Sequence, residues 1–273
     1  MCMAAFINVV GNCMVLTVII RHRGMRTRTN LFLVNLAVAD IFVGTLVVPF
    51  SVGTMIKNGW IVDEGSTMYN FSCGFNTWMN SFCITTSIHT LMYISIHKYF
   101  SIVKPLGTPL KLRTILMMMA AAWVWAFLNS FLVVTQFGTE YKVGASQCGP
   151  KYPASLQAYI VHIEFQATTL VIPFVIMLFC YGRMFKAIKE HTDRMKANTT
   201  VEADVILLQQ KKVTITMFIV LAGFFFTAFL PYVVYAFYVA GVRQSARNHG
   251  QYPDILFNPL VSEVIMNYNI NMN

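Results

Sequence analysis

An ionisable residue inside an apolar stretch is the first feature of this sequence that points to chemistry. Asp40 is the only Asp, Glu, Lys or Arg between residues 31 and 56. Burying a lone carboxylate in hydrocarbon is costly, so such a group faces the interior of a helix bundle and is functional by default. One interpretation is a structural carboxylate that accepts hydrogen bonds from Asn12 and Asn269.

The six cysteines divide into two groups. Four of them lie within apolar runs, where a buried thiol is the default interpretation: Cys2, Cys13, Cys83 and Cys180. The other two, Cys73 and Cys148, fall in or beside loops and can face the same compartment. They form the one plausible disulfide, on an oxidising side.

The composition indicates a membrane protein. Of the 273 residues, 56% are hydrophobic and 11% are charged, whereas soluble domains carry about 25% charged residues. The net charge of +9 does not indicate nucleic acid, because the basic residues cluster between apolar spans and do not alternate with stacking aromatics.

Hydropathy separates six apolar spans of the length that crosses a membrane, at residues 2–20, 31–56, 74–97, 114–136, 156–182 and 213–240, and a weaker seventh at 255–273. We therefore predict an all-α integral membrane protein, a seven-transmembrane helix bundle in one domain over residues 1–273. The other helices are expected to pack around the stretch from Cys73 to Leu106. The seventh helix is expected to be incomplete, in a fragment trimmed at both ends.

The distribution of basic residues sets the orientation. Three alternate loops, 21–30, 98–113 and 183–212, hold four, four and seven basic residues, or 15 of the 20 Lys and Arg. By the positive-inside rule these loops are cytoplasmic and the N-terminus is outside. The sequon at Asn70 then lies outside, where glycosylation is possible, and the one at Asn198 lies inside and stays bare.

Each of the seven spans contains a short motif, and these motifs and the distances between them resemble those of the rhodopsin-like (class A) G-protein-coupled receptors. The marks are Gly11-Asn12-x-x-Val15, Asn35-Leu36-Ala37-Val38-Ala39-Asp40, Cys73 with Lys98 25 residues on and then Pro105-Leu106, Val124-Trp125, Pro173 with Tyr181, Phe225-x-x-Ala228-Phe229-Leu230-Pro231, and Asn269 with Asn273. The match covers nearly the whole chain.

The resemblance implies three groups of site residues. A sodium site has Asp40 as its carboxylate, with oxygen donors from Ser87, Asn269, Asn273 and Asn12; hard oxygen donors suit such an ion. A ligand pocket lies in the outer half of the bundle, with candidates Asn80, Ser81, Ile84, His162, Gln166, Phe229, Tyr232, Glu263 and Asn267. Coupling and activation involve His97, Lys98, Tyr99, Tyr181, Phe225 and Pro231.

At two positions the sequence differs from members of the family whose ligands are amines or retinal, and the resemblance therefore implies which ligands are not expected. Asn80 occupies the position where amine receptors have an aspartate, which disfavours a monoamine. Asn267 occupies the position of the opsin lysine, so no retinal is expected. Apart from the possible sodium ion, no cofactor or metal is predicted.

His97-Lys98-Tyr99 stands where the family usually has Asp-Arg-Tyr. Lysine is a point charge and cannot copy the bidentate geometry of arginine. Lys211 and Lys212 stand where an acidic partner is often found, so the resting-state ionic latch cannot form. Raised basal activity, weak coupling and lost coupling all remain open.

We therefore expect a plasma-membrane receptor that binds an extracellular small molecule or peptide and activates a heterotrimeric G protein as helix six swings outward. The alternative is a seven-helix decoy or partner protein that no longer couples because of Lys98. A transporter or channel is disfavoured by the single clear mid-membrane charge. An enzyme is disfavoured because no metal-ligand cluster, nucleophile elbow or P-loop occurs. The basic inner loops suit anionic membrane lipids.

Overall fold

A computed structural model of the chain describes residues 2–63, 65–103, 110–142, 147–151 and 156–195, together with the single positions 212, 215, 218, 219, 222, 223, 226 and 230. The chain forms two compact units: the first is Met1–Lys142 with Ser146–Thr214, and the second is Ile215–Asn273 with the short segment Val143–Ala145. In the second unit the described positions, from Ile215 to Leu230, are helical. Most of the predicted span 213–240 and all of 255–273 lie outside the described residues.

The first unit contains five long helical stretches in the described ranges. They are α1 (Cys2–Arg21), α2 with η2 and α3 (Arg28–Phe42, Val43–Val47 and Val48–Lys57), α4 (Thr67–Val103), α5 (Leu112–Phe137), and α6 with η4 and α7 (Leu156–Gln166, Ala167–Val171 and Ile172–Met195). A short 3-10 turn, η1 (Arg23–Met25), joins α1 to α2. Each of the first five predicted spans lies within one of these stretches. Helix α4 begins before the predicted residue 74 and ends after residue 97, and α7 continues well past residue 182.

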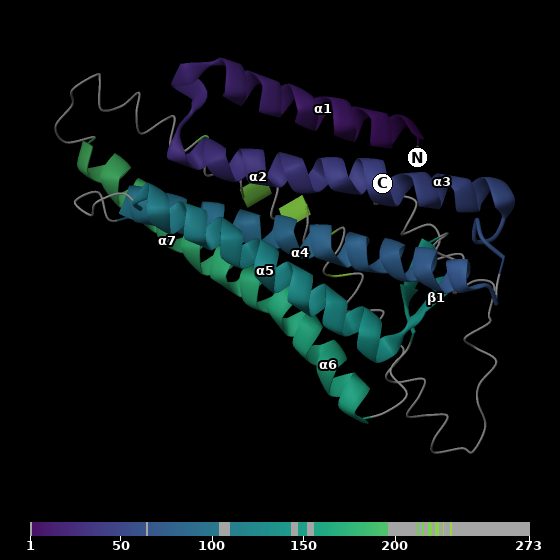
Figure 1. Ribbon diagram of the computed structural model, residues 1–273. Coiled ribbons are helices and arrows are strands. Elements are labelled where there is room, and N and C mark those ends of the chain that lie inside the picture. Colours follow the sequence, from purple (N-terminus) through teal and green to yellow (C-terminus); the bar gives the residue numbers. More distant parts are fainter. Residues whose placement is uncertain are drawn as a thin grey trace. The chain divides into compact units, whose positions relative to one another are not determined.

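Helix α4 is the centre of this unit. It contacts α2, α5 and α7, whereas α1 packs on α2 and η2 (Figure 1). Many of its buried residues are Ser or Thr, and several bond to a carbonyl of the preceding turn, as Thr86 does to Phe82 (2.8 Å) and Thr90 does to Thr86 (2.7 Å). This local bonding satisfies the hydroxyl without a partner helix, so a rather polar helix can be buried in the bundle.

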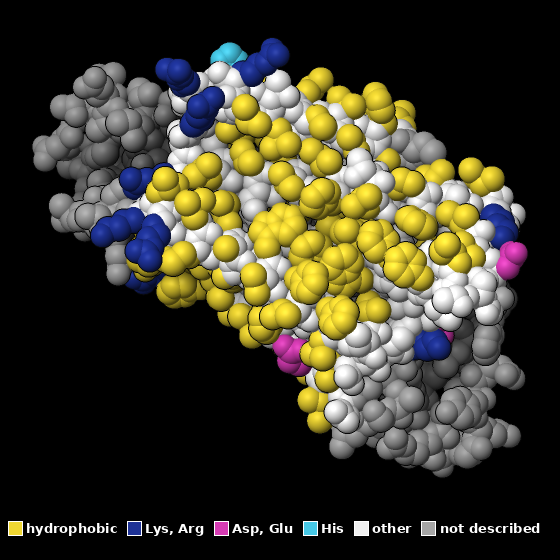
Figure 2. Space-filling model, in the orientation of Figure 1, with side chains coloured by type: hydrophobic (Ala, Val, Ile, Leu, Met, Phe, Trp, Pro, Cys, Tyr) yellow, Lys and Arg dark blue, Asp and Glu magenta, His cyan; other side chains and the backbone are white. Residues whose placement is uncertain are grey.

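Three helical stretches among the described residues are long and apolar enough to cross a membrane: Arg28–Lys57, Leu112–Phe137 and Ile160–Glu190. Their outward faces are apolar, with Phe131 on α5 and Phe179 on α7 more than half exposed. Figure 2 shows hydrophobic side chains spread over the visible face, with Lys and Arg gathered mainly at one end. This is the surface expected of helices that face lipid.

The second helical stretch changes pitch in its middle. The π-helical turn η2 follows directly after α2, and Pro49 lies in the first turn of α3. A proline cannot donate to the carbonyl four residues before it, and a wider turn accommodates its ring. Two side-chain amides from other helices bond to backbone oxygens at the ends of this segment: Asn8 to Asp40 O (3.1 Å) and Asn76 to Val47 O (3.3 Å).

A β-hairpin, which the sequence analysis did not predict, follows α5. Strands β1 (Thr139–Lys142) and β2 (Gln147–Pro150) pair antiparallel, with Tyr141 opposite Cys148. On β1 the backbone N–H of Tyr141 donates to the Tyr69 hydroxyl (3.2 Å), and on β2 Pro150 has no N–H. Each strand therefore has one position whose N–H is not available to pair with another chain.

Candidate functional site

Asp40 meets Ser87 at the interface of α2 and α4. The Ser87 hydroxyl donates to Oδ1 of Asp40 at 3.3 Å, although the two residues are 47 positions apart in the chain. Both side chains are half-buried. The structure thus brings together two of the five residues predicted for a sodium site. Asn269 and Asn273 lie outside the described residues.

Asn12 does not bond to Asp40. Its amide donates to the backbone oxygen of Asn8 (2.9 Å) and to Asn8 Oδ1 (2.6 Å) within α1. Asn8 in turn donates to the backbone oxygen of Asp40, beside η2. The link from α1 to Asp40 therefore runs through Asn8, which the sequence analysis missed, and the interpretation of Asn12 as a direct hydrogen-bond donor to the carboxylate is wrong.

A hydrogen-bonded junction next to this site joins three helices. Asn35 of α2 donates to the Thr90 hydroxyl of α4 at 2.8 Å and accepts from Nε1 of Trp123 of α5 at 2.7 Å. The mark predicted for this span was Val124-Trp125, but Trp125 is 40% exposed. Trp123 is the tryptophan that holds α5 against the bundle.

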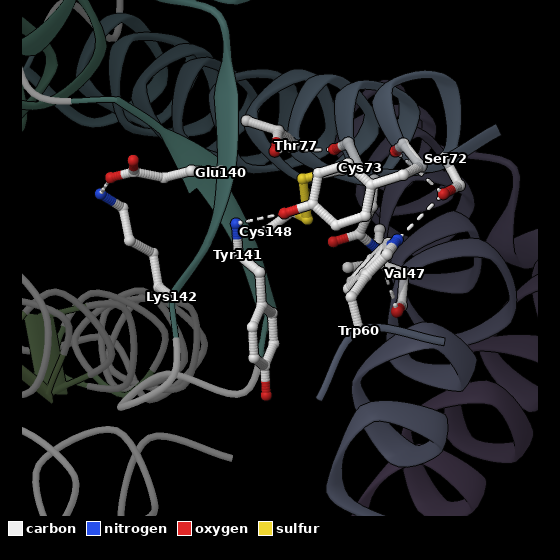
Figure 3. The surroundings of a disulfide bond; sticks show 11 residues. Val47, Trp60, Ser72, Cys73, Thr77, Glu140, Tyr141, Lys142 and Cys148 are labelled. Atoms are coloured by element: carbon white, nitrogen blue, oxygen red, sulfur yellow. Dashed lines mark hydrogen bonds and ion pairs between the residues drawn. A yellow bond between two sulfur atoms is a disulfide. The ribbon is translucent and has the colours of Figure 1, made fainter. Parts of the chain in front are cut away.

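The disulfide predicted at the outer mouth is present. Cys73 at the start of α4 is bonded to Cys148 of β2, and both side chains are buried (Figure 3). Trp60 from the preceding loop packs beside it and donates from Nε1 to the Ser72 hydroxyl at 2.9 Å. The Trp60 ring stacks on Phe50, with centroids 5.7 Å apart. These contacts hold the loop, the helix and the hairpin together.

An exposed ion pair closes the same loop. Lys57, at the end of α3, donates to Oδ1 of Asp63 at 2.8 Å and to the backbone oxygen of Ile61 at 3.1 Å. The nearby ammonium lowers the pKa of the Asp63 carboxyl below its ordinary value, because the charged carboxylate accepts its hydrogen bond.

The sequon residue Asn70 lies on the first turn of α4 and is exposed. Its partner Ser72 is buried, accepts the hydrogen bond from Trp60, and donates to the backbone oxygen of Tyr69 (3.2 Å). The serine of the sequon is therefore also a structural residue of the outer mouth.

At the inner end of α4 the three residues His97, Lys98 and Tyr99 point to different neighbours. His97 is buried, with its ring centroid 5.9 Å from that of Phe32 at the start of α2. The ring of Tyr99 lies 6.0 Å from that of Phe179 on α7. Lys98 is half-buried and has no ion-pair partner among the described residues.

Two further residues lie at the inner end of the bundle. Tyr181, predicted for activation, is buried on α7. Arg28, at the first position of α2, donates to the backbone oxygen of Leu110 at 3.1 Å and so joins the first and second inner loops. Phe225 and Pro231 lie outside the described residues.

The predicted pocket residues are only partly described. Asn80, Ser81, His162 and Gln166 are half-buried, and Ile84 is 42% exposed. The His162 ring packs edge-on against Phe137 of α5, with centroids 5.9 Å apart. The remaining candidates, Phe229, Tyr232, Glu263 and Asn267, lie outside the described residues. Among the described residues no group of three His, Cys, Asp or Glu side chains is arranged to hold a metal.

Comparison with known families decides what kind of protein carries these features. The family of 7 transmembrane receptors (rhodopsin family) matches residues 11–267. The chain belongs to this family. It is therefore a multi-pass membrane receptor with the rhodopsin-like seven-helix fold.

Relatives of this receptor bind different kinds of molecules, as their names state. It is 28% identical to the tachykinin-like peptides receptor 86C of Drosophila melanogaster, over 88% of this chain and 48% of that protein. It is 29% identical to trace amine-associated receptor 9 of Rattus norvegicus, over 85% of this chain and 70% of that protein. It is 32% identical to the octopamine receptor beta-2R of Chilo suppressalis, over 65% of this chain and 44% of that protein.

The fold of the receptor matches a solved structure. Squid rhodopsin superposes with a TM-score of 0.74 at 19% identity, over 85% of this chain and 64% of that one. At that identity the likeness shows the fold alone. The receptor spans about half the length of the tachykinin-like peptides receptor that it matches.

Proposed function

We propose that this receptor binds an extracellular ligand in the outer half of its helix bundle and activates a heterotrimeric G protein at the plasma membrane by outward movement of helix six. The observation that carries the proposal is the family match over residues 11–267. The arrangement of α4 is consistent with it, because this one helix runs from the disulfide at the outer mouth to Lys98 at the inner end.

The contacts at the inner end of α4 are consistent with a receptor that lacks the resting-state ion pair. Lys98 is half-buried and has no acidic partner among the described residues, so no ion pair in this region opposes activation. An ammonium still attracts acidic groups of a partner, but as a point charge it lacks the fork that arginine offers to a carboxylate.

The test compares ligand-free nucleotide exchange on G proteins in cells that express the wild type or Lys98→Arg at equal surface levels. Lys111→Arg, an exposed lysine of the same inner side, is the matched control. Exchange above mock-transfected cells in the wild type supports a coupled receptor. Exchange in Lys98→Arg alone supports the decoy alternative. Nucleotide exchange no higher than in mock-transfected cells for every variant would count against G-protein coupling at the inner end of the bundle.

The ligand proposed is a small molecule or a peptide. The names of the relatives include both peptide and amine receptors. Asn80 on α4 offers a neutral amide where an amine would need a carboxylate, so a monoamine is disfavoured. No retinal is proposed, because Asn267 takes the place of the lysine that a Schiff base requires.

We also propose that a sodium ion binds at Asp40. The carboxylate and the adjacent Ser87 hydroxyl are oxygen donors of the kind such an ion prefers, and Asn269, Asn273 and Asn12 are the remaining candidates. An ion that binds only the folded receptor raises its apparent stability.

The sodium proposal predicts that NaCl raises the melting temperature of the purified receptor relative to choline chloride at equal ionic strength. Asp40→Asn should abolish the difference, and Ser87→Ala should reduce it. Asp63→Asn is the matched control, because this carboxylate is exposed at the outer loop. An equal response of the wild type and Asp40→Asn would contradict the proposal.

A further inference from the structure

The amide side chain of Asn8 on α1 bonds to the main chain of α2 at Asp40. Its Nδ2 donates to the backbone oxygen of Asp40 at 3.1 Å, across the interface between the two helices (Figure 1). Water is absent from the hydrocarbon layer of a membrane, so a donor and an acceptor that meet there keep each other as partners. Asn8 therefore fastens α1 to the residue of α2 that carries the candidate sodium ligand.

Asn12 fixes the orientation of the Asn8 amide. One turn further along α1, its Nδ2 donates to Oδ1 of Asn8 at 2.6 Å and to the backbone oxygen of Asn8 at 2.9 Å. A side-chain amide has one donor end and one acceptor end. With Oδ1 held by Asn12, the donor end faces Asp40. The reverse orientation would bring two oxygens together at Asp40, so the two bonds of the amide select one orientation.

A glycine of α2 leaves room for this amide. Gly44 lies one turn after Asp40, in η2, and a Cβ atom at its position would lie 3.4 Å from Nδ2 of Asn8 and 2.5 Å from Cγ2 of Val9. Helix α1 and η2 therefore approach each other closely, which allows a side chain as short as asparagine to reach the Asp40 oxygen.

The Asp40 carboxylate lies between two contacts that come from different helices. From the α4 side, the Ser87 hydroxyl is 3.3 Å from Oδ1 of Asp40, which is longer than the usual distance of about 2.5–3.0 Å between two hydrogen-bonded oxygens. From the α1 side, Asn8 holds the backbone. The aspartate side chain is short, so its carboxylate moves with the backbone. A small shift of α2 at this point would separate the carboxylate from Ser87.

We propose that Asn8 is a positioning residue: its bond to the backbone oxygen of Asp40, oriented by Asn12, holds the Asp40 carboxylate against Ser87 and so sets its affinity for sodium. The affinity part of this inference rests on the sodium site proposed above. Groups that hold an ion ligand in place change the affinity for the ion although they do not touch it. Asn12 then contributes through Asn8.

The test measures the melting temperature of the purified receptor over a series of NaCl concentrations, with choline chloride keeping the ionic strength constant. Asn8→Leu keeps the approximate size of the side chain and removes its donor and its acceptor. It should raise the sodium concentration that gives half of the stabilisation about tenfold. Asn8→Ala, which leaves a gap in place of a new apolar contact, should shift that concentration in the same direction.

Asn129→Leu is the matched control. Asn129 of α5 also makes an amide bond to another helix, because its Nδ2 donates to the Thr168 hydroxyl at 3.1 Å. Its loss should lower the melting temperature and leave the half-maximal sodium concentration unchanged, which separates a general loss of stability from positioning. A half-maximal sodium concentration that stays at the wild-type value in both Asn8 variants would overturn the proposal, however far their melting temperatures fall.

A double-mutant cycle separates this inference from the sodium proposal itself. In choline chloride alone, Asn8→Leu and Ser87→Ala act on the same carboxylate, so the double variant should lose less melting temperature than the sum of the two single losses. Asn8→Leu combined with Asn129→Leu should give additive losses. A wild type that does not respond to sodium defeats the sodium proposal and the affinity part of the inference, and the cycle then decides the positioning part. Additive losses for Asn8 and Ser87 would overturn it.

Discussion

At the scale of single residues, position on a helix decides which of two similar side chains matters. Trp123 and Trp125 are two residues apart, which is about 200° around a helix. One indole reaches Asn35 at 2.7 Å, and the other is 40% exposed on the outside of α5. The motif predicted from the family resemblance, Val124-Trp125, lies in this region of α5, but the tryptophan that bonds to the bundle is Trp123.

Trp123→Phe should destabilise the receptor by about 1–3 kcal/mol, because it leaves the buried Oδ1 of Asn35 without its donor. Trp125→Phe makes the same chemical change on the exposed face of α5 and should have little effect. Thermal unfolding of both variants measures the difference. Equal losses would show that the bond between Trp123 and Asn35 does not stabilise the bundle.

The sequon at Asn70 offers a second test at this scale, because its two polar residues have separate roles. If the receptor carries a glycan, both Asn70→Gln and Ser72→Ala should remove a glycosidase-sensitive mass shift on a gel. Only Ser72→Ala should also lower thermal stability, by about 1 kcal/mol, since it removes the acceptor of the Trp60 N–H. Ser72→Thr keeps both the sequon and the hydroxyl and serves as the control.

At the scale of elements, apolar run length predicted where helices occur but not where they end or change pitch. The run of residues 74–97 marks only the part of α4 that suits hydrocarbon, and the helix continues through polar residues from Thr67 to Val103. The π-helical turns η2 and η4 have no signature in composition. Asn8 was missed for the same reason, because its acceptor lies beside η2.

Helix α1 approaches η2 closely at Gly44, where a Cβ atom would lie 2.5 Å from Cγ2 of Val9. Gly44→Ala should therefore destabilise the receptor by about 1–3 kcal/mol through overpacking. Val9→Ala in the same chain should restore much of the loss by making room for the new methyl group. Gly11→Ala is the control, because nothing lies within 4 Å of its Cβ position. A loss that Val9→Ala does not relieve would place the strain elsewhere.

At the scale of the whole molecule, the sequence predicted the seven-helix receptor fold from the sum of its marks, and the family match confirms it. The contact between Asp40 and Ser87 joins positions 47 apart. No local pattern predicts such a contact, so it was expected from resemblance alone. The hairpin was not predicted, because strands of four residues are too short to show a period of two.

The disulfide connects these scales, since it links cysteines 75 positions apart and closes a segment that holds most of α4, all of α5 and β1. In the chain-entropy description, a loop of this length contributes about 4 kcal/mol by restricting the unfolded chain. Replacing both Cys73 and Cys148 by serine should therefore lower the melting temperature strongly and reduce surface expression. Cys13→Ala, at a free and exposed cysteine of α1, should leave both unchanged. If the double variant melts like the wild type, the outer mouth is held by the packing of Trp60, Phe50 and Tyr141, and the covalent bond adds little.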